Sequence, residues 1–166
     1  MFSTRLQDAI NAQINAEFVS AYVYLAMAAH FEEQNLSGFA HWMRVQYEEE
    51  TFHALKLFDY MVDRGGHIVL QPIAAPPAAF GSPLQVFEHV LAHEQKVTGL
   101  IHDLYRLALE EGDYPTQVML HWFIDEQVEE EKNATEMVAK LRLNGDFGPG
   151  LLLLDRELAA RPKEED

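Results

Sequence analysis

The sequence contains no cysteine, and this absence excludes disulfide bonds, thiolate zinc sites and iron–sulfur clusters. Positive charge is scarce, with 12 lysines and arginines against 27 aspartates and glutamates and a formal net charge of −15. Such a chain attracts cations, and we expect neither nucleic acid nor an anionic membrane as a partner. There is no apolar signal-peptide core near the start and no apolar run of membrane-spanning length, so a cytoplasmic protein is expected.

What the sequence does contain is helical periodicity. Its 166 residues, 48% of them hydrophobic, fit one domain over 1–166 that ends in a short charged tail from about residue 161. Ser3 or Thr4 is expected to cap the first helix, Ser37 the second, and Ser82 the third as part of a capping box. The expected helices cover about 4–33, 38–64, 83–111, 113–144 and 150–160.

The connections between these helices predict the topology. The first two helices, and likewise the third and fourth, are joined by only a few residues and must form antiparallel hairpins. Residues 66–81, with three prolines, can extend over roughly 50 Å, the length of a long helix bundle. The sequence therefore predicts an all-α four-helix bundle with a long crossover and a short fifth helix. The apolar run at 67–70 is expected to pack against a second subunit.

Each of the four long helices carries an acidic residue near its middle, one heptad from apolar residues on both sides. These residues are Glu17, Glu50, Glu94 and Glu130. A buried carboxylate is costly unless a cation compensates for its lost hydration. Two ferrous ions, with a combined charge of about +4, would balance four carboxylates. His53 follows Glu50 at i+3 on the same helix face, and it would add neutral ligation together with Gln127.

Further polar residues lie around this predicted centre. Because successive helical residues turn by about 100°, Glu49 and Glu129 border the core instead of entering it. Together with Glu126 they are interpreted either as a second carboxylate cluster or as a solvated acidic face. Tyr24 lies one heptad after Glu17, as a core aromatic or as a hydroxyl that bonds a ligand carboxylate or delivers an electron.

The pattern Glu50-x-x-His53 is weak alone, because such pairs arise by chance on solvated helix edges. A metal-free helical scaffold with surface acids is therefore one alternative. A soluble di-iron oxidase or peroxidase of the rubrerythrin-like type, without mineral storage, is another. That type usually has a second Glu-x-x-His and a cysteine-rich module, and this chain has neither.

The sequence resembles the non-haem bacterial ferritins over nearly its whole length, most clearly in segments 47–53, 93–97 and 122–131. The resemblance implies a ferritin-like fold and a tyrosine near the centre at Tyr24. It also implies three iron positions. One is held by Glu17, Glu50 and His53, the second by Glu50, Glu94 and Glu130 with Gln127 beside them, and the third by Glu49, Glu126, Glu129 and Glu130.

The resemblance also implies an activity and an assembly. Members of the family oxidise ferrous iron with dioxygen or hydrogen peroxide, as ferroxidases, and store a ferric mineral inside a homo-oligomeric cage of twenty-four subunits. Two irons per subunit at the centre and a third site are thus expected. Haem-binding relatives carry a methionine where this chain has Thr51 and a second Glu-x-x-His where it has Gln127 and Glu130, so no haem is expected.

Overall fold

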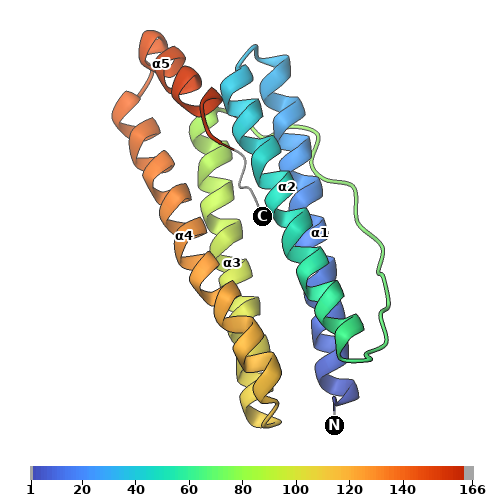
Figure 1. Ribbon diagram of the computed structural model, residues 1–166. Helices are drawn as coiled ribbons and strands as arrows, with labels where there is room; N and C mark the ends of the chain where they lie inside the picture. The colour runs from blue at the N-terminus through green and yellow to red at the C-terminus, as the bar shows by residue number, and fades with distance from the viewer. Residues whose placement is uncertain (1, 163–166) are drawn as a thin grey trace.

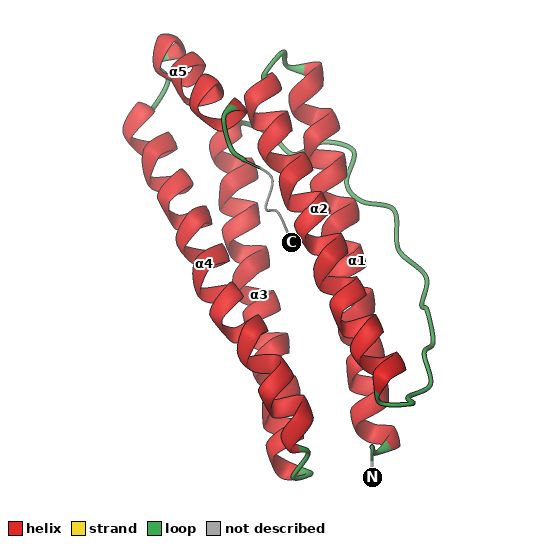
Figure 2. Cartoon of the chain, in the orientation of Figure 1, coloured by secondary structure: helices red, strands yellow, loops and turns green. Residues whose placement is uncertain are grey.

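The computed structural model describes residues 2–162, which form five helices and, within that range, no strand (Figures 1 and 2). No helix among them is both long and apolar enough to cross a membrane. The all-α prediction is confirmed, and the expected helix bounds agree with the observed ones to within two residues. The helices are α1 Thr4–Glu33, α2 Ser37–Asp63, α3 Pro83–Glu110, α4 Tyr114–Asn144 and α5 Gly148–Ala159.

The long helices are arranged as two hairpins, α1 with α2 and α3 with α4 (Figure 1). The crossover leaves the lower end of α2 and climbs along the outside of α1 to the start of α3, so that α2 and α3 run in the same direction. The short α5 lies across the upper end of the bundle against α2. This is the predicted four-helix bundle with a long crossover and a fifth helix.

The helix starts show which local signals were correct. The Ser3 side chain accepts a hydrogen bond from the Leu6 backbone, and Ser82 forms the expected capping box with Gln85. The prediction that Ser37 caps the second helix is wrong, because Ser37 is already the first helical residue and no side chain at the N-cap makes a capping bond. The Asp155 side chain of α5 instead accepts hydrogen bonds from two N–H groups of this turn that have no partner within the helix, a long-range contact that local sequence does not predict.

Two apolar clusters fill the bundle, one towards each end. The first includes Phe31, Phe39, Phe87 and Met137, and the second includes Ile10, Leu57, Ile101 and Leu120. Along each long helix, the buried acidic residue lies between the stretches that enter these two clusters. The predicted metal centre is therefore a buried polar layer with apolar packing on both sides, where water has little access.

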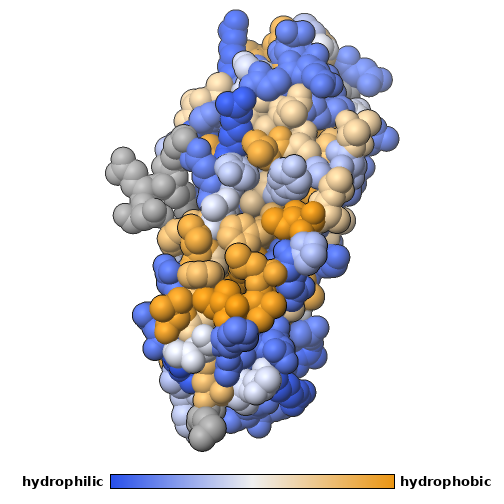
Figure 3. Space-filling model, turned by 90° about the vertical axis from the view of Figure 1, so that its right-hand side faces the viewer, coloured by the Kyte–Doolittle hydropathy of each residue, from blue (hydrophilic) through white to orange (hydrophobic). Residues whose placement is uncertain are grey.

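The crossover is anchored to α1 but exposes apolar side chains. The Asn11 amide donates to the His67 carbonyl at 2.9 Å, and its oxygen accepts from the Val69 backbone at 2.9 Å. Val69 and Leu70 are nonetheless exposed, and Figure 3 shows apolar surface gathered on the side of the molecule that carries the crossover. The expectation of a second subunit here stays a prediction. Of the expected charged tail from about residue 161, residues 163–166 lie outside the described residues.

Candidate metal centre

The middle of the bundle brings together three of the predicted ligands. Glu17 comes from α1, and Glu50 and His53 come from successive turns of α2. One ligand atom from each of the three side chains lies within 4.8 Å of the others, and all three side chains are buried. With this spacing the three side chains could bind one metal ion together, since carboxylate and imidazole ligands bind iron jointly in helical bundles.

The other two helices complete a group of four carboxyls. Glu94 on α3 and Glu130 on α4 are buried, and both act electrostatically on Glu50. The pKa of Glu50 rises well above its ordinary value, chiefly through burial and then through the negative charges of Glu94, Glu17 and Glu130. The spacing of one acid per helix thus places four carboxyls around one buried position.

Neutral side chains hold these carboxyls in place. The amide of Gln13 donates to Glu17 Oε1 at 2.7 Å, and the amide of Gln46 donates to Glu130 Oε2 at 2.9 Å. One oxygen each of Glu17 and Glu50 is buried without a hydrogen-bond partner among the described residues. Buried oxygens of this kind are rare in folded proteins unless they bind an ion or water. The donor set therefore fits a hard or borderline cation.

Glu94 is held by two different donors. The Tyr24 hydroxyl donates to Oε1, and the Gln127 amide donates to Oε2 at 3.3 Å. Tyr24 is also a buried member of the apolar core, so both interpretations made from the sequence describe it. Gln127 also donates to the Glu94 backbone carbonyl and to Thr98, so in this structure its amide nitrogen faces Glu94 and orients it.

Burial makes the metal-free centre retain protons. Burial raises the pKa of Glu94 to about 7, and the hydrogen bonds from Tyr24 and Gln127 limit the rise. Burial likewise raises the pKa of Glu17, and the hydrogen bond from Gln13 opposes it. A cation that replaces these protons would lower every one of these pKa values, so metal binding and proton release are coupled.

The imidazole of His53 is prepared for coordination. Burial lowers its pKa to about 4, and the positive charge of Lys56 contributes, so the ring is neutral at pH 7. Its Nδ1 lies 3.5 Å from Glu50 Oε2, and its Nε2 lies 3.9 Å from Glu126 Oε1. The Trp122 ring packs edge-on against it, with 5.3 Å between the centroids. A neutral ring with a carboxylate on each side suits a metal ligand.

Comparison with known proteins shows the family of this chain. A family model for the ferritin-like domain matches residues 7–144. The bacterial non-heme ferritin of Bacteroides fragilis is 44% identical over 161 residues, covering 97% of this chain and 100% of the relative, and that of Staphylococcus saprophyticus is 43% identical over 165 residues, covering 99% of each. The chain belongs to the ferritin family.

Solved structures support the same assignment. The open pore ferritin of the archaeon Archaeoglobus fulgidus superposes with a TM-score of 0.97 at 48% identity, covering 98% of this ferritin and 100% of that chain. A humanized archaeal ferritin superposes with a TM-score of 0.98 at the same identity. These values confirm the predicted ferritin-like fold, including the crossover and the fifth helix.

The acids that border the centre of this ferritin lie in three different surroundings. Glu49 is buried and bonded to Arg161, at 3.0 and 2.8 Å. Glu126 lies beside His53, and Glu129 is exposed on α4. The third iron position stays a prediction, and in the structure one of its proposed ligands already has a cationic partner.

Three residues around the centre were missed from the sequence. Gln13 and Gln46 each lie four residues before a core glutamate, but Gln46 bonds Glu130 on another helix instead of Glu50, so this spacing does not identify the bonds. Arg161 follows α5, and no local pattern indicates that it reaches α2.

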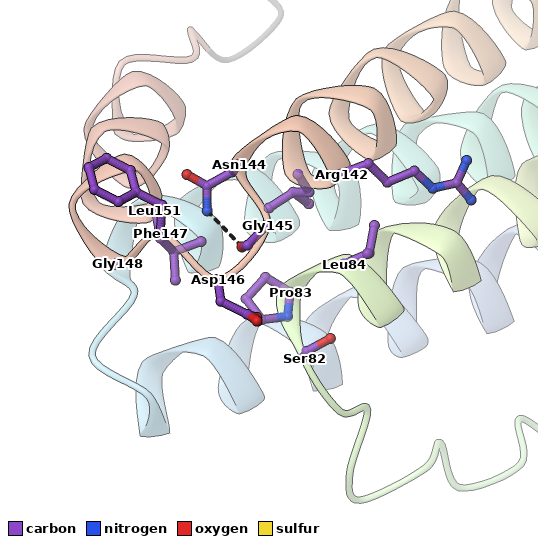
Figure 4. Close-up of a pocket in the computed structure, with 11 residues that line it drawn as sticks. Ser82, Pro83, Leu84, Arg142, Asn144, Gly145, Asp146, Phe147, Gly148 and Leu151 are labelled. Atoms are coloured by element: carbon purple, nitrogen blue, oxygen red, sulfur yellow. Dashed lines mark hydrogen bonds between the residues drawn. The ribbon is translucent and has the colours of Figure 1, made fainter.

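A separate pocket of about 390 Å³ lies between the start of α3 and the turn from α4 to α5 (Figure 4). In this view Pro83 and Leu84 face the turn that contains Gly145 and Phe147. The pocket contains none of the predicted ligands, and its walls are formed mainly by helix ends. It is therefore not the metal centre.

Proposed function

We propose that this protein stores iron and oxidises ferrous iron at the buried centre before storage. Membership of the ferritin family supports iron storage in general. The observation that carries the finer proposal is the group of four buried carboxyls and a neutral imidazole, with buried oxygens that have no hydrogen-bond partner among the described residues. Such a layer destabilises an empty bundle and is compensated by binding cations.

In this proposal ferrous iron is the substrate, and two ions bind per subunit. Glu17, Glu50 and His53 hold one ion, and Glu50 bridges to a second ion held by Glu94 and Glu130. Each ferrous ion gives up one electron, and dioxygen accepts two electrons and two protons to form hydrogen peroxide. Hydrogen peroxide can replace dioxygen as the oxidant. The ferric product then leaves towards an internal store, and the ligand carboxyls become available again.

Tyr24 and Gln127 have supporting roles in the proposed reaction. Their bonds to Glu94 orient this carboxylate towards the second ion. Tyr24 can also deliver one of the two electrons to the oxidant in place of a ferrous ion, with its hydroxyl proton passing to the bonded Glu94 carboxylate, and a ferrous ion then returns that electron to Tyr24. Glu49, Glu126 and Glu129 are proposed to form a third, more weakly binding position with Glu130, on the way to the store.

We further propose that the chain acts as one cytoplasmic domain within a closed cage of twenty-four subunits. Solved relatives include an open pore ferritin, which supports cage assembly within the family. Exposed apolar side chains support contacts between subunits, at Val69 and Leu70 on the crossover and at Leu152 and Leu153 on α5. Light scattering of the native protein tests the cage. A mass of one or two subunits without mineral would favour the rubrerythrin-like alternative.

An anaerobic titration with ferrous iron, followed by exposure to oxygen, tests the oxidation. The wild type should bind two ions tightly per subunit and oxidise them rapidly. Glu50→Ala should abolish rapid oxidation, because it removes the ligand shared by both ions. Glu33→Ala provides a control, since Glu33 is exposed at the end of α1. Oxidation by Glu50→Ala at the wild-type rate would show that the centre is assigned wrongly.

A further inference from the structure

Arg161, two residues after the end of α5, places its guanidinium cation at the edge of the metal centre. Arg161 Nη2 donates to both carboxylate oxygens of Glu49, at 3.0 and 2.8 Å. The guanidinium lies over the Trp42 ring, 4.7 Å from its centroid. The Glu49 side chain is 8% exposed and the Arg161 side chain 18%, so water screens this pair only weakly.

The start of α2 is shaped to receive α5. Asp155 Oδ1 accepts hydrogen bonds from the backbone N–H groups of Gly38 at 2.8 Å and Phe39 at 3.1 Å. A Cβ atom at Gly38 would lie 1.7 Å from the Asp155 carbonyl oxygen, so only glycine permits this approach. His41 Nε2 lies 2.9 Å from the Arg161 carbonyl oxygen. The backbone at Arg161 is therefore held in place beside α2.

The guanidinium itself is held less completely. Nη2 makes both bonds to Glu49, while Nη1 is buried without a hydrogen-bond partner among the described residues. Arg161 also lies near enough to Glu130 to act on its charge. The backbone of Arg161 is thus firmly anchored, whereas its side chain has an incomplete set of hydrogen bonds. This side chain lies near Glu130, a proposed iron ligand.

We propose that Arg161 competes with iron for Glu49 at the third position. The guanidinium neutralises Glu49 while this position is empty, and an arriving cation gains Glu49 as a ligand only when Arg161 withdraws. The inference rests on the proposed function, because the third position is part of it. Two consequences follow: the third cation binds more weakly than the pair, and its binding displaces the guanidinium from Trp42.

Anaerobic calorimetric titration of the full-length protein with ferrous iron, and separately with zinc, tests the competition. In Arg161→Gln the third cation should bind roughly tenfold more tightly or better, since a charge-assisted pair no longer has to be broken. Arg161→Lys, which retains the charge but not the planar group, should fall between that variant and the wild type. Glu49→Gln should remove the third binding event in either background.

The control variant is Arg142→Gln, which removes a different arginine–glutamate pair, 2.8 Å from Glu88 on the exposed surface. It should leave all binding events at their wild-type affinities. Circular dichroism and light scattering of each variant establish that helices and assembly are retained. The ion held by Glu17, Glu50 and His53 should bind equally in all of these arginine variants, because Arg161 makes no bond to these residues that the structure shows. The ion at Glu130 should bind at least as tightly in Arg161→Gln as in the wild type, because the variant removes a positive charge that acts on Glu130.

Tryptophan fluorescence during a zinc titration provides a test on the unsubstituted protein. The emission should change when the third equivalent binds, and this change should be absent in Trp42→Phe and in Glu49→Gln. The inference would be overturned if Arg161→Gln bound the third cation with wild-type affinity and the fluorescence of the wild type did not change at the third equivalent of zinc. Failure of the wild type to bind the two tight ions would instead overturn the proposed function, so the two failures are distinguishable.

Discussion

The cost of the empty metal centre can be measured by substituting a single ligand. Glu50 is 1% exposed, and one of its oxygens has no hydrogen-bond partner among the described residues. Burial raises its pKa well above the ordinary 4.5, and the charges of Glu94, Glu17 and Glu130 add to the rise. Glutamine has nearly the same shape but carries no charge and needs no proton. We therefore expect Glu50→Gln to stabilise the metal-free protein while abolishing rapid iron oxidation.

The size and sign of this effect follow from proton linkage. A carboxyl with a raised folded-state pKa binds its proton more tightly when folded, so its cost is absent below the unfolded pKa and grows as the pH rises. Whatever the folded-state pKa, the cost at pH 7 for a carboxyl with an unfolded pKa of 4.5 has an upper limit of roughly 3 kcal/mol, because each pH unit above 4.5 adds at most about 1.4 kcal/mol. Glu50→Gln should raise the free energy of unfolding by up to about this amount at pH 7 and by less than about 1 kcal/mol at pH 5.

Differential scanning calorimetry of chelator-treated protein between pH 5 and 7.5, at one protein concentration, measures this difference. For a chain of this length, 3 kcal/mol corresponds to a rise of roughly 6 to 12 °C in the melting temperature. The control is Glu33→Gln, which makes the same change of charge at an exposed position. Equal shifts in the two variants, or a shift in Glu50→Gln that does not depend on pH, would refute the reasoning. Ferrous iron should stabilise the wild type and not the variant.

Three further outcomes are expected. The affinity for ferrous iron should fall as the pH drops below 7, because Glu94, whose pKa is about 7, then retains the proton that iron must displace. Calorimetry in buffers of different ionisation enthalpy should show that protons are released when iron binds. Asp113→Ala should lower the free energy of unfolding by roughly 2 to 3 kcal/mol in urea, since Asp113 caps α4 and pairs with Arg64 at 2.8 Å, whereas Asp113→Asn, which keeps the cap, should lose less. Gly38→Ala should lower the free energy of unfolding by roughly 1 to 3 kcal/mol and accelerate hydrogen exchange in α5, because the added Cβ would meet the Asp155 carbonyl oxygen. Unchanged hydrogen exchange would contradict the tight contact.

The bundle was predictable because several local signals agree with the global topology. The heptad stripes define four long helices, Ser82 and Gln85 mark the start of α3, and a segment with three prolines cannot be a fifth long helix. Its length then leaves a crossover as the simplest connection. Each signal concerns residues close together in the chain, which is the range over which helix caps and helical periodicity act.

The α5 contacts could not be predicted in this way. Ser37 has the side chain of an N-cap, yet the N–H groups of this turn bond to Asp155, which is 117 residues from Gly38 in sequence. Arg161 lies in what reads as a charged tail, and only the docking of α5 brings it to Glu49. A local pattern carries no information about a partner so far along the chain.

The candidate site was partly predictable for a different physical reason. A charged residue within an apolar stripe contradicts its surroundings, and such contradictions in four helices at the same level indicated the carboxyls directly. The glutamines gave no such contradiction, because a neutral amide in a helix is compatible with either the surface or the interior. Gln13 and Gln46 therefore became informative only when their bonds to Glu17 and Glu130 were visible.

The groups that bond the buried carboxyls leave the negative charge of the centre available to a cation. Gln13, Gln46 and Tyr24 are neutral donors, which orient the oxygens they bond but leave the negative charge of the group uncompensated. A lysine or arginine in any of these places would stabilise the empty bundle and compete with the metal for the same oxygens. Among residues 2–162, the bonds that the structure shows place such a cation at the border, where Arg161 bonds Glu49. The carboxyls of the inner layer thus remain without a bonded cationic side chain among the described residues, while Glu49 at the border has a partner that iron would have to displace under the proposed competition.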